Sequence, residues 1–187
     1  MNTGKYNLSF VGGALFHRES VKLAGRYLEK GDWNAVRDEV MARNLLQART
    51  TSSARRICRE ICSRLKRLNK DEMELLVEGD YQEQASLLWI AVCRHYRFIC
   101  EFSIEVIRER FLTLRYDLGY EDFDVFFNAK MEWHEELGKI ATGLDPMLLR
   151  GNPHRSQTIA TYAFPRRSVG TRKNDQKRRM HQWMHAV

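Results

Sequence analysis

No proline occurs in this chain before Pro146, and the other two prolines are Pro153 and Pro165. Proline interrupts helices because its ring removes a backbone N–H donor and clashes with the preceding turn. The body of the chain is therefore able to form closely packed helices.

Long hydrophobic runs are also absent, since the longest, Leu87–Cys93, is far shorter than the roughly 20 residues that span a membrane. The N-terminus has no secretory signal pattern. Hydrophobic residues make up 43% of the 187 residues, which is enough to build a core. We therefore expect a soluble, cytoplasmic protein with no membrane partner.

Cysteine spacing gives no zinc motif, because the four cysteines form no CxxC pair and no compact set with histidine. They are Cys58, Cys62, Cys93 and Cys100. Each lies among apolar positions of a predicted helix, so we expect buried, free thiols.

Catalytic motifs are missing as well. The chain has no nucleotide-binding loop, no nucleophile elbow and no recognisable pair of catalytic carboxylates. His134, within Trp133–Glu136, lacks the second histidine four residues later that a zinc-binding helix needs, so we predict a capping or packing role for it. We expect no enzymatic activity, no metal and no cofactor.

Charge divides the chain into three blocks. Residues 1–70 hold 15 Lys and Arg against 6 Asp and Glu, residues 71–149 hold 7 against 17, and residues 150–187 hold 9 against 1. Such asymmetry indicates a basic surface for nucleic acid, with an acidic middle that keeps the protein soluble or contacts basic partners. The alternative is that the first two blocks pair with each other.

Apolar periodicity predicts an all-α fold, a compact multi-helix bundle. Gly31 is placed to end a first helix, and Asp32 and Asp80 to cap later ones. The predicted regions are a helical region 1–70 that starts with an apolar arm (Tyr6–Phe16) and ends in a basic helix, an acidic helical region 71–141 packed on it, and an irregular basic tail 142–187. The predicted helices are 17–30, one from Trp33, 54–70, 73–77, one from Asp80 to Val92, 98–114 and 120–133.

The predicted helix 54–70 has two faces, at about 100° per residue. Its apolar arc holds Ala54, Ile57, Cys58, Ile61, Cys62, Leu65 and Leu68. Glu60 is the only acid between Arg49 and Lys70, and Ser52 or Ser53 is placed to cap the helix. With the preceding helix, this basic helix is compatible with a helix-turn-helix-like arrangement.

A phosphate surface is the partner that the opposite, basic arc predicts, because hydroxyls and amides at a helix N-terminus add to its cations. The arc has no Asn or Gln before Asn69, so we expect backbone contacts with little sequence preference. The alternative is a solvated helix face. The candidate nucleic-acid-binding residues are Arg49, Thr51, Ser52, Arg55, Arg56, Arg59, Lys66, Arg67 and Lys70.

Three stretches together resemble the BrxA family of BREX phage-exclusion systems, over roughly residues 5–141. They are Tyr6–Phe10, Leu45–Arg56, and Tyr116–Asp124 followed by Trp133-His134. The resemblance implies a helical fold like that of the RNA-binding antitermination factor NusB, a role in bacterial phage defence, and binding to double-stranded DNA. Alternatives are an RNA-binding factor of the NusB type and an adaptor whose acidic block contacts other defence proteins.

The tail departs from the family, because residues 142–187 lack its helical pattern. Their basic clusters, such as Arg166-Arg167 and Lys177–Arg179, either add nonspecific phosphate contacts or form a solvated end without function.

Overall fold

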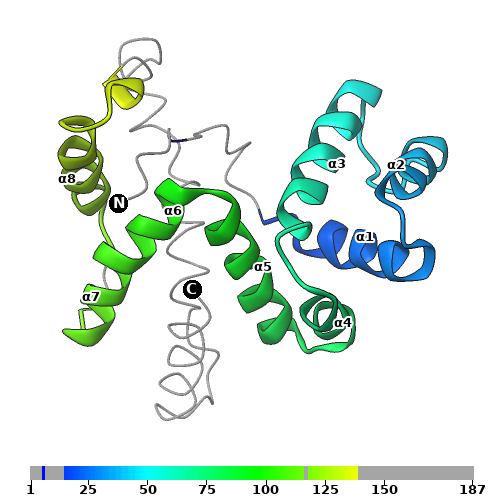
Figure 1. Ribbon diagram of the computed structural model, residues 1–187, viewed down its shortest axis with the longest axis horizontal. Coiled ribbons are helices and arrows are strands. Elements are labelled where there is room, and N and C mark those ends of the chain that lie inside the picture. Colours follow the sequence, from blue (N-terminus) through cyan, green and yellow to red (C-terminus); the bar gives the residue numbers. More distant parts are fainter. Residues whose placement is uncertain (1–5, 7–14, 116–117, 139–187) are drawn as a thin grey trace. The chain divides into compact units, whose positions relative to one another are not determined.

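The computed structural model describes Tyr6, residues 15–115 and residues 118–138 (Figure 1). Contacts divide the chain into two compact units, and we describe each by itself. The five-helix unit is Leu15–His95, and the aromatic unit is Tyr96 onward together with the N-terminal residues as far as Ala14. The predictions for the tail 142–187 and for most of the apolar arm lie outside the described residues.

The described residues form helices and no strands, so the all-α prediction is confirmed. The likeness to NusB stays a prediction. The helices of the five-helix unit are α1 (His17–Lys30), α2 (Trp33–Ala42), α3 (Thr51–Leu65), α4 (Lys70–Glu78) and α5 (Tyr81–His95). Those of the aromatic unit are α6 (Arg97–Phe102), the π-helix η1 (Ser103–Ile107), α7 (Arg108–Leu112) and α8 (Tyr120–Met131).

Helix boundaries follow the capping residues. Gly31 ends α1 in the left-handed conformation (φ 69°), and its N–H donates to the carbonyl oxygen of Tyr27. The Asp32 carboxylate accepts from the N–H groups of Asn34 and Ala35, which also lowers the pKa of Asp32. Asp80 accepts in the same way at the start of α5. These three predicted boundaries are confirmed.

The core of the five-helix unit lies around α1, which contacts each of the other four helices (Figure 1). Helices α4 and α5 therefore belong to the same unit as the basic helix, although the charge pattern separates them at residue 70. The side chains that are fully buried here include Leu23, Val36, Val40, Ile61, Leu65, Leu76 and Val92.

Phenylalanines fill the aromatic unit. Phe98 and Phe102 of α6 meet Phe126 of α8 with ring centroids 5.1 and 5.3 Å apart, edge to face. Tyr6 is buried against Phe98 and belongs to this cluster. Phe98, Phe102, Phe126 and Phe127 are buried core residues.

The predicted single helix 98–114 is wrong in detail. A π-helical turn interrupts it at Ser103–Ile107, and the helix ends at Leu112. Ser103 is buried at the start of this turn and donates to the carbonyl oxygen of Ile99. One inserted residue shifts the helix face at a π turn, which periodicity in the sequence alone does not reveal.

A buried ion pair lies within α3. Arg64 donates from Nε to the Glu60 carboxylate at 2.8 Å, and Glu60 and Arg64 are only 8% and 3% exposed. The Arg64 guanidinium also lies 5.8 Å from the ring centroid of Phe16. The only acid of the basic stretch is thus directed inward, toward an arginine of its own helix.

We predict that Arg64→Met destabilises the five-helix unit by about 3–5 kcal/mol, because the buried Glu60 carboxylate loses this partner. The double variant Glu60→Gln/Arg64→Met should lose clearly less. Urea unfolding at neutral pH measures both. Arg59→Met, on the exposed side of α3, is the control and should change the midpoint little. Equal losses in the single and double variants would contradict this role of the pair.

Candidate nucleic-acid interface

Helix α3 separates its residues into an inner and an outer side. The inner side packs against α1, α2 and α5. It carries the predicted apolar arc, whose members Ala54, Cys58, Ile61, Cys62 and Leu65 are all buried. Ile57 is the partly exposed member of the arc. The burial of this arc confirms the two-faced helix that the sequence predicts.

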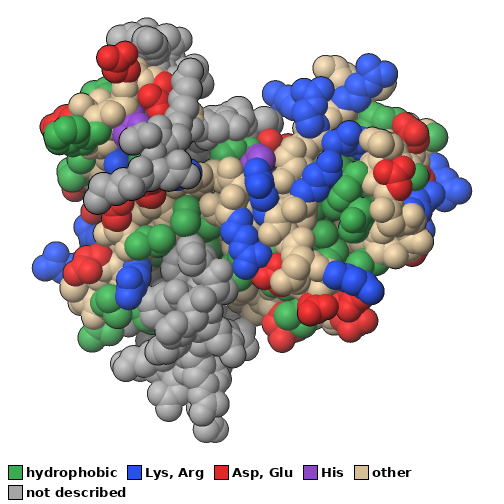
Figure 2. All heavy atoms as spheres, in the orientation of Figure 1, with side chains coloured by type: hydrophobic (Ala, Val, Ile, Leu, Met, Phe, Trp, Pro, Cys, Tyr) green, Lys and Arg blue, Asp and Glu red, His purple; other side chains and the backbone are tan. Residues whose placement is uncertain are grey.

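All nine predicted binding residues are exposed, and Figure 2 shows Lys and Arg side chains gathered over α3. Ser52, Arg55, Arg56, Arg59 and Lys66 fall within about 100° of one another around the helix axis. Arg55 and Lys66 are eleven residues apart, which corresponds to about 17 Å along the axis. We call these five residues, with Arg49, Thr51, Arg67 and Lys70, the basic face.

Few acids neutralise the basic face. Lys70 Nζ lies 3.6 Å from Glu74 Oε1. Within the described part of the chain, Arg49, Arg55, Arg56 and Arg59 make no ion pair. The internal charge pairing considered from the sequence therefore does not involve these four arginines among the described residues.

Thr50 caps α3. Its Oγ1 accepts from the N–H of Ser53 at 3.1 Å, so the helix begins at Thr51, and the predicted cap at Ser52 or Ser53 is wrong. The extended backbone of Thr50 is what a cap requires, whereas Ser52 and Ser53 are helical. The hydroxyls of Thr51 and Ser52 therefore lie in the first, electropositive turn of α3.

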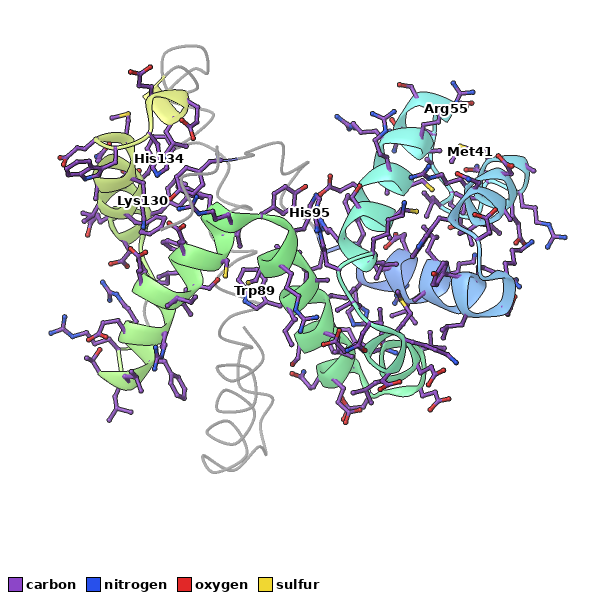
Figure 3. All side chains as sticks on the ribbon, in the orientation of Figure 1. Met41, Arg55, Trp89, His95, Lys130 and His134 are labelled. Atoms are coloured by element: carbon purple, nitrogen blue, oxygen red, sulfur yellow. The ribbon has the colours of Figure 1, made fainter. Side chains whose placement is uncertain are left out.

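The C-terminal end of the basic face is held by α4 and α5. Arg94 donates to the Arg67 carbonyl oxygen at 3.2 Å and to both carboxylate oxygens of Glu72. Arg67 Nε lies 3.5 Å from His95 Nδ1, and Figure 3 labels Arg55 and His95 near opposite ends of α3. Burial and the charge of Arg67 lower the pKa of His95, which keeps the imidazole neutral near pH 7.

The predicted basic helix is too long. Helix α3 ends at Leu65, and Lys70 begins α4. Asn69 and Glu72 form a reciprocal capping box, so the backbone starts a new helix there. Leu68 is nevertheless buried in the connecting turn, as its place in the apolar arc predicts.

The connection between α2 and α3 is longer than the 3–4-residue turn of a standard helix-turn-helix. It runs from Arg43 to Thr50, and Asn44 and Gln47 adopt positive φ angles of 44° and 49° within it. The helix-turn-helix-like arrangement therefore lacks the short turn of the standard motif.

Sequence reasoning missed Arg37. It lies on α2 and is partly exposed, and its charge helps to lower the pKa of Cys62 on the inner side of α3. The Cys58 and Cys62 sulfurs are 3.9 Å apart, and their hydrogen bond raises the pKa of Cys58 and, with Arg37, lowers that of Cys62. The position of Arg37 follows from packing between helices, which the pattern of α3 alone does not contain.

The structure also shows where the cysteines and His134 lie. All four cysteines are free, three are buried and Cys100 is partly exposed. The His134 ring centroid lies 4.2 Å from that of Tyr6, which confirms its packing role. No cluster of His, Cys, Asp or Glu in residues 15–115 or 118–138 is suited to hold a metal. Among the helices that the structure describes, none has the length and apolarity to cross a membrane.

Comparison with known proteins gives consistent matches. Residues 4–143 match the protein family described as BrxA. A "BREX protein BrxA" of Escherichia coli O9:H4 (strain HS) is 28% identical over 83% of this chain and 78% of that protein. Proteins of the same name from Bacillus cereus (strain H3081.97) and Paramagnetospirillum magneticum are 26% and 25% identical. These two alignments cover 54% and 65% of this chain, and 51% and 61% of the relatives.

We predict that Thr50→Ala destabilises the five-helix unit by about 1 kcal/mol, because the N–H of Ser53 loses its acceptor in the first turn of α3. Urea unfolding measures this. Ser52→Ala, an exposed hydroxyl inside the helix, is the matched control and should have a much smaller effect. A larger loss for Ser52→Ala than for Thr50→Ala would contradict the assignment of the cap.

Proposed function

Because the chain belongs to the BrxA family and is thus a component of a BREX phage-defence system, we propose that it binds double-stranded DNA through the basic face of α3. In this proposal the chain is a non-enzymatic accessory protein that works in the cytoplasm. The observation that carries the proposal is a row of exposed cations on α3 whose arginines have no acidic partner among the described residues.

The chemistry of the basic face favours phosphate over base edges. From Thr51 to Lys66 it offers arginine, lysine and hydroxyl groups, and no Asn or Gln. Arginine and helix N-terminal groups are common phosphate contacts, which position a duplex without reading its sequence. We therefore expect binding with little sequence preference.

The length of the basic face favours a duplex. Its cations extend for about 17 Å along α3, from Arg55 to Lys66, which exceeds the roughly 12 Å width of the B-DNA major groove. Cations at the two ends of α3 are thus able to meet phosphates on both sides of one groove. Arg67 and Lys70 add two further cations at the C-terminal end of the basic face, which α4 and α5 hold in place.

We predict that Arg55→Glu/Arg59→Glu weakens binding to a random-sequence duplex by at least about tenfold at low salt. The log–log dependence of the affinity on salt should become shallower by about 2, since two of about five expected phosphate contacts are lost. Fluorescence anisotropy at about 50 to 200 mM salt measures both quantities.

The matched control is Arg108→Glu/Arg115→Glu, which changes the net charge equally at two exposed arginines of the aromatic unit. It should leave the salt dependence unchanged. Equal losses in the two double variants would mean that total charge, and not the basic face, determines the affinity.

We also predict that duplex DNA displaces a labelled duplex more effectively than a structured RNA of the same length does. An A-form helix has a deep, narrow major groove, so phosphates are arranged differently along it. Competition at constant salt measures this preference. Stronger displacement by the RNA would instead favour an RNA-binding function of the NusB type.

A further inference from the structure

The outer face of α8 has a composition opposite to that of the basic face. At helical spacing, its outer positions, all exposed except the partly exposed Asp124, bring acidic residues together with small and apolar ones. We call this surface the α8 face, and it consists of Glu121, Asp124, Val125, Asn128, Ala129 and Glu132, with Trp133 directly after the helix. Figure 2 shows Asp and Glu side chains beside hydrophobic ones over this helix.

The opposite side of α8 holds the helix in place. Phe126 and Phe127 are buried in the aromatic cluster. Lys130, labelled in Figure 3, is directed to the same side and lies 2.8 Å from Glu101 and 2.6 Å from Glu105. The one cation of α8 is therefore neutralised on the inner side, so it does not compensate the carboxylates of the α8 face.

The carboxylates of the α8 face have no cation of their own. Arg110 pairs with Asp122, at the edge of the helix. Within residues 96–115 and 118–138, Glu121, Asp124 and Glu132 form no ion pair. This part of the chain holds nine acidic and five basic residues, so its net charge is negative.

Two large apolar side chains are exposed among these acids. Val125 is 70% exposed and Trp133 is 83% exposed. Trp133 is held in place, because its backbone N–H donates to the Lys130 carbonyl oxygen and the neighbouring His134 packs on Tyr6. Tryptophan is usually well buried in monomers and is enriched at the energetic centres of interfaces.

We propose that the α8 face docks a basic segment of a partner protein, one that carries arginine together with apolar side chains. The carboxylates would pair with the cations, and the Trp133 indole would receive an arginine guanidinium over its ring. Nucleic acid and anionic membranes do not fit this face, because both carry negative charge. The α8 face is thus an interaction surface separate in sequence and in charge from the basic face.

A second copy of this chain is a poorer occupant. The basic face would supply arginines, but its outer residues between Thr51 and Lys66 are hydroxyl-bearing or charged and offer no large exposed apolar side chain for Val125 and Trp133. The twelve residues of α8 extend for about 18 Å, which gives a small contact area. We therefore expect a weak, reversible interaction of the transient class.

The test uses the full-length protein and a fluorescein-labelled helical peptide of about 12 residues, the length that matches α8, with arginine and leucine on one face. Anisotropy should show saturable binding. A peptide with glutamine in place of arginine should not bind. Trp133→Ala should weaken binding about tenfold, and Asp124→Lys/Glu132→Lys should abolish it.

Matched controls lie in the five-helix unit. Leu75→Ala removes another exposed apolar side chain, and Asp38→Lys/Glu78→Lys reverses two other exposed acids. Both controls should bind the peptide as the unchanged protein does. The α8-face variants should also retain affinity for duplex DNA, so that failure here is distinguishable from failure of the proposed DNA binding.

Three outcomes would overturn the proposal. The first is no binding of the arginine peptide by the unchanged protein. The second is equal binding by the α8-face variants and the controls. The third is concentration-dependent self-association, seen by sedimentation and lost in Asp124→Lys/Glu132→Lys, which would assign the α8 face to a second copy of the chain.

Discussion

The burial of one side of α3 is the constraint on which the five-helix unit and its candidate site depend. Helices α1, α2 and α5 all pack on that side, and Ile61 and Leu65 are fully excluded from solvent there. Apolar burial contributes about 25 cal/mol per Å², so the rotation of α3 about its axis is strongly determined by its apolar arc. Once that rotation is fixed, the side chains of Arg55 and Arg59 must point toward solvent. The basic face is therefore a consequence of core packing as much as of charge.

Charges within each unit are sorted by the same principle. In α3, Glu60 and Arg64 are directed inward and pair with each other, which leaves the outer side without an acid. In α8, Lys130 is directed inward and pairs with Glu101 and Glu105, which leaves the outer side without a cation. Buried charges require partners because desolvation is costly. In each case the charge that would oppose the sign of the exposed face is paired on the inner side of its helix.

Much of this arrangement could be predicted from the sequence, and the exceptions have physical reasons. Gly31 ends a helix, and Asp32 and Asp80 each cap one. These roles depend only on the local backbone, so the residue type is enough to predict them. The cap at Thr50 is harder to identify, because four consecutive residues carry a hydroxyl that could cap α3. Only the backbone conformation at the start of the helix selects one of them. The π turn at Ser103–Ile107 and the inward Glu60 depend on packing between helices, which periodicity does not encode. The exposure of the nine site residues could be predicted, whereas the influence of Arg37 from α2 on Cys62 could not.

The most direct test of the central claim is arginine-specific chemical modification of the full-length protein, with and without a random-sequence duplex, read by mass spectrometry. We predict that DNA protects Arg55, Arg56 and Arg59 from modification, while the exposed Arg108 and Arg115 react at unchanged rates. Equal protection of all five arginines, or protection of Arg108 and Arg115 alone, would contradict the claim that the outer side of α3 is the DNA-binding surface.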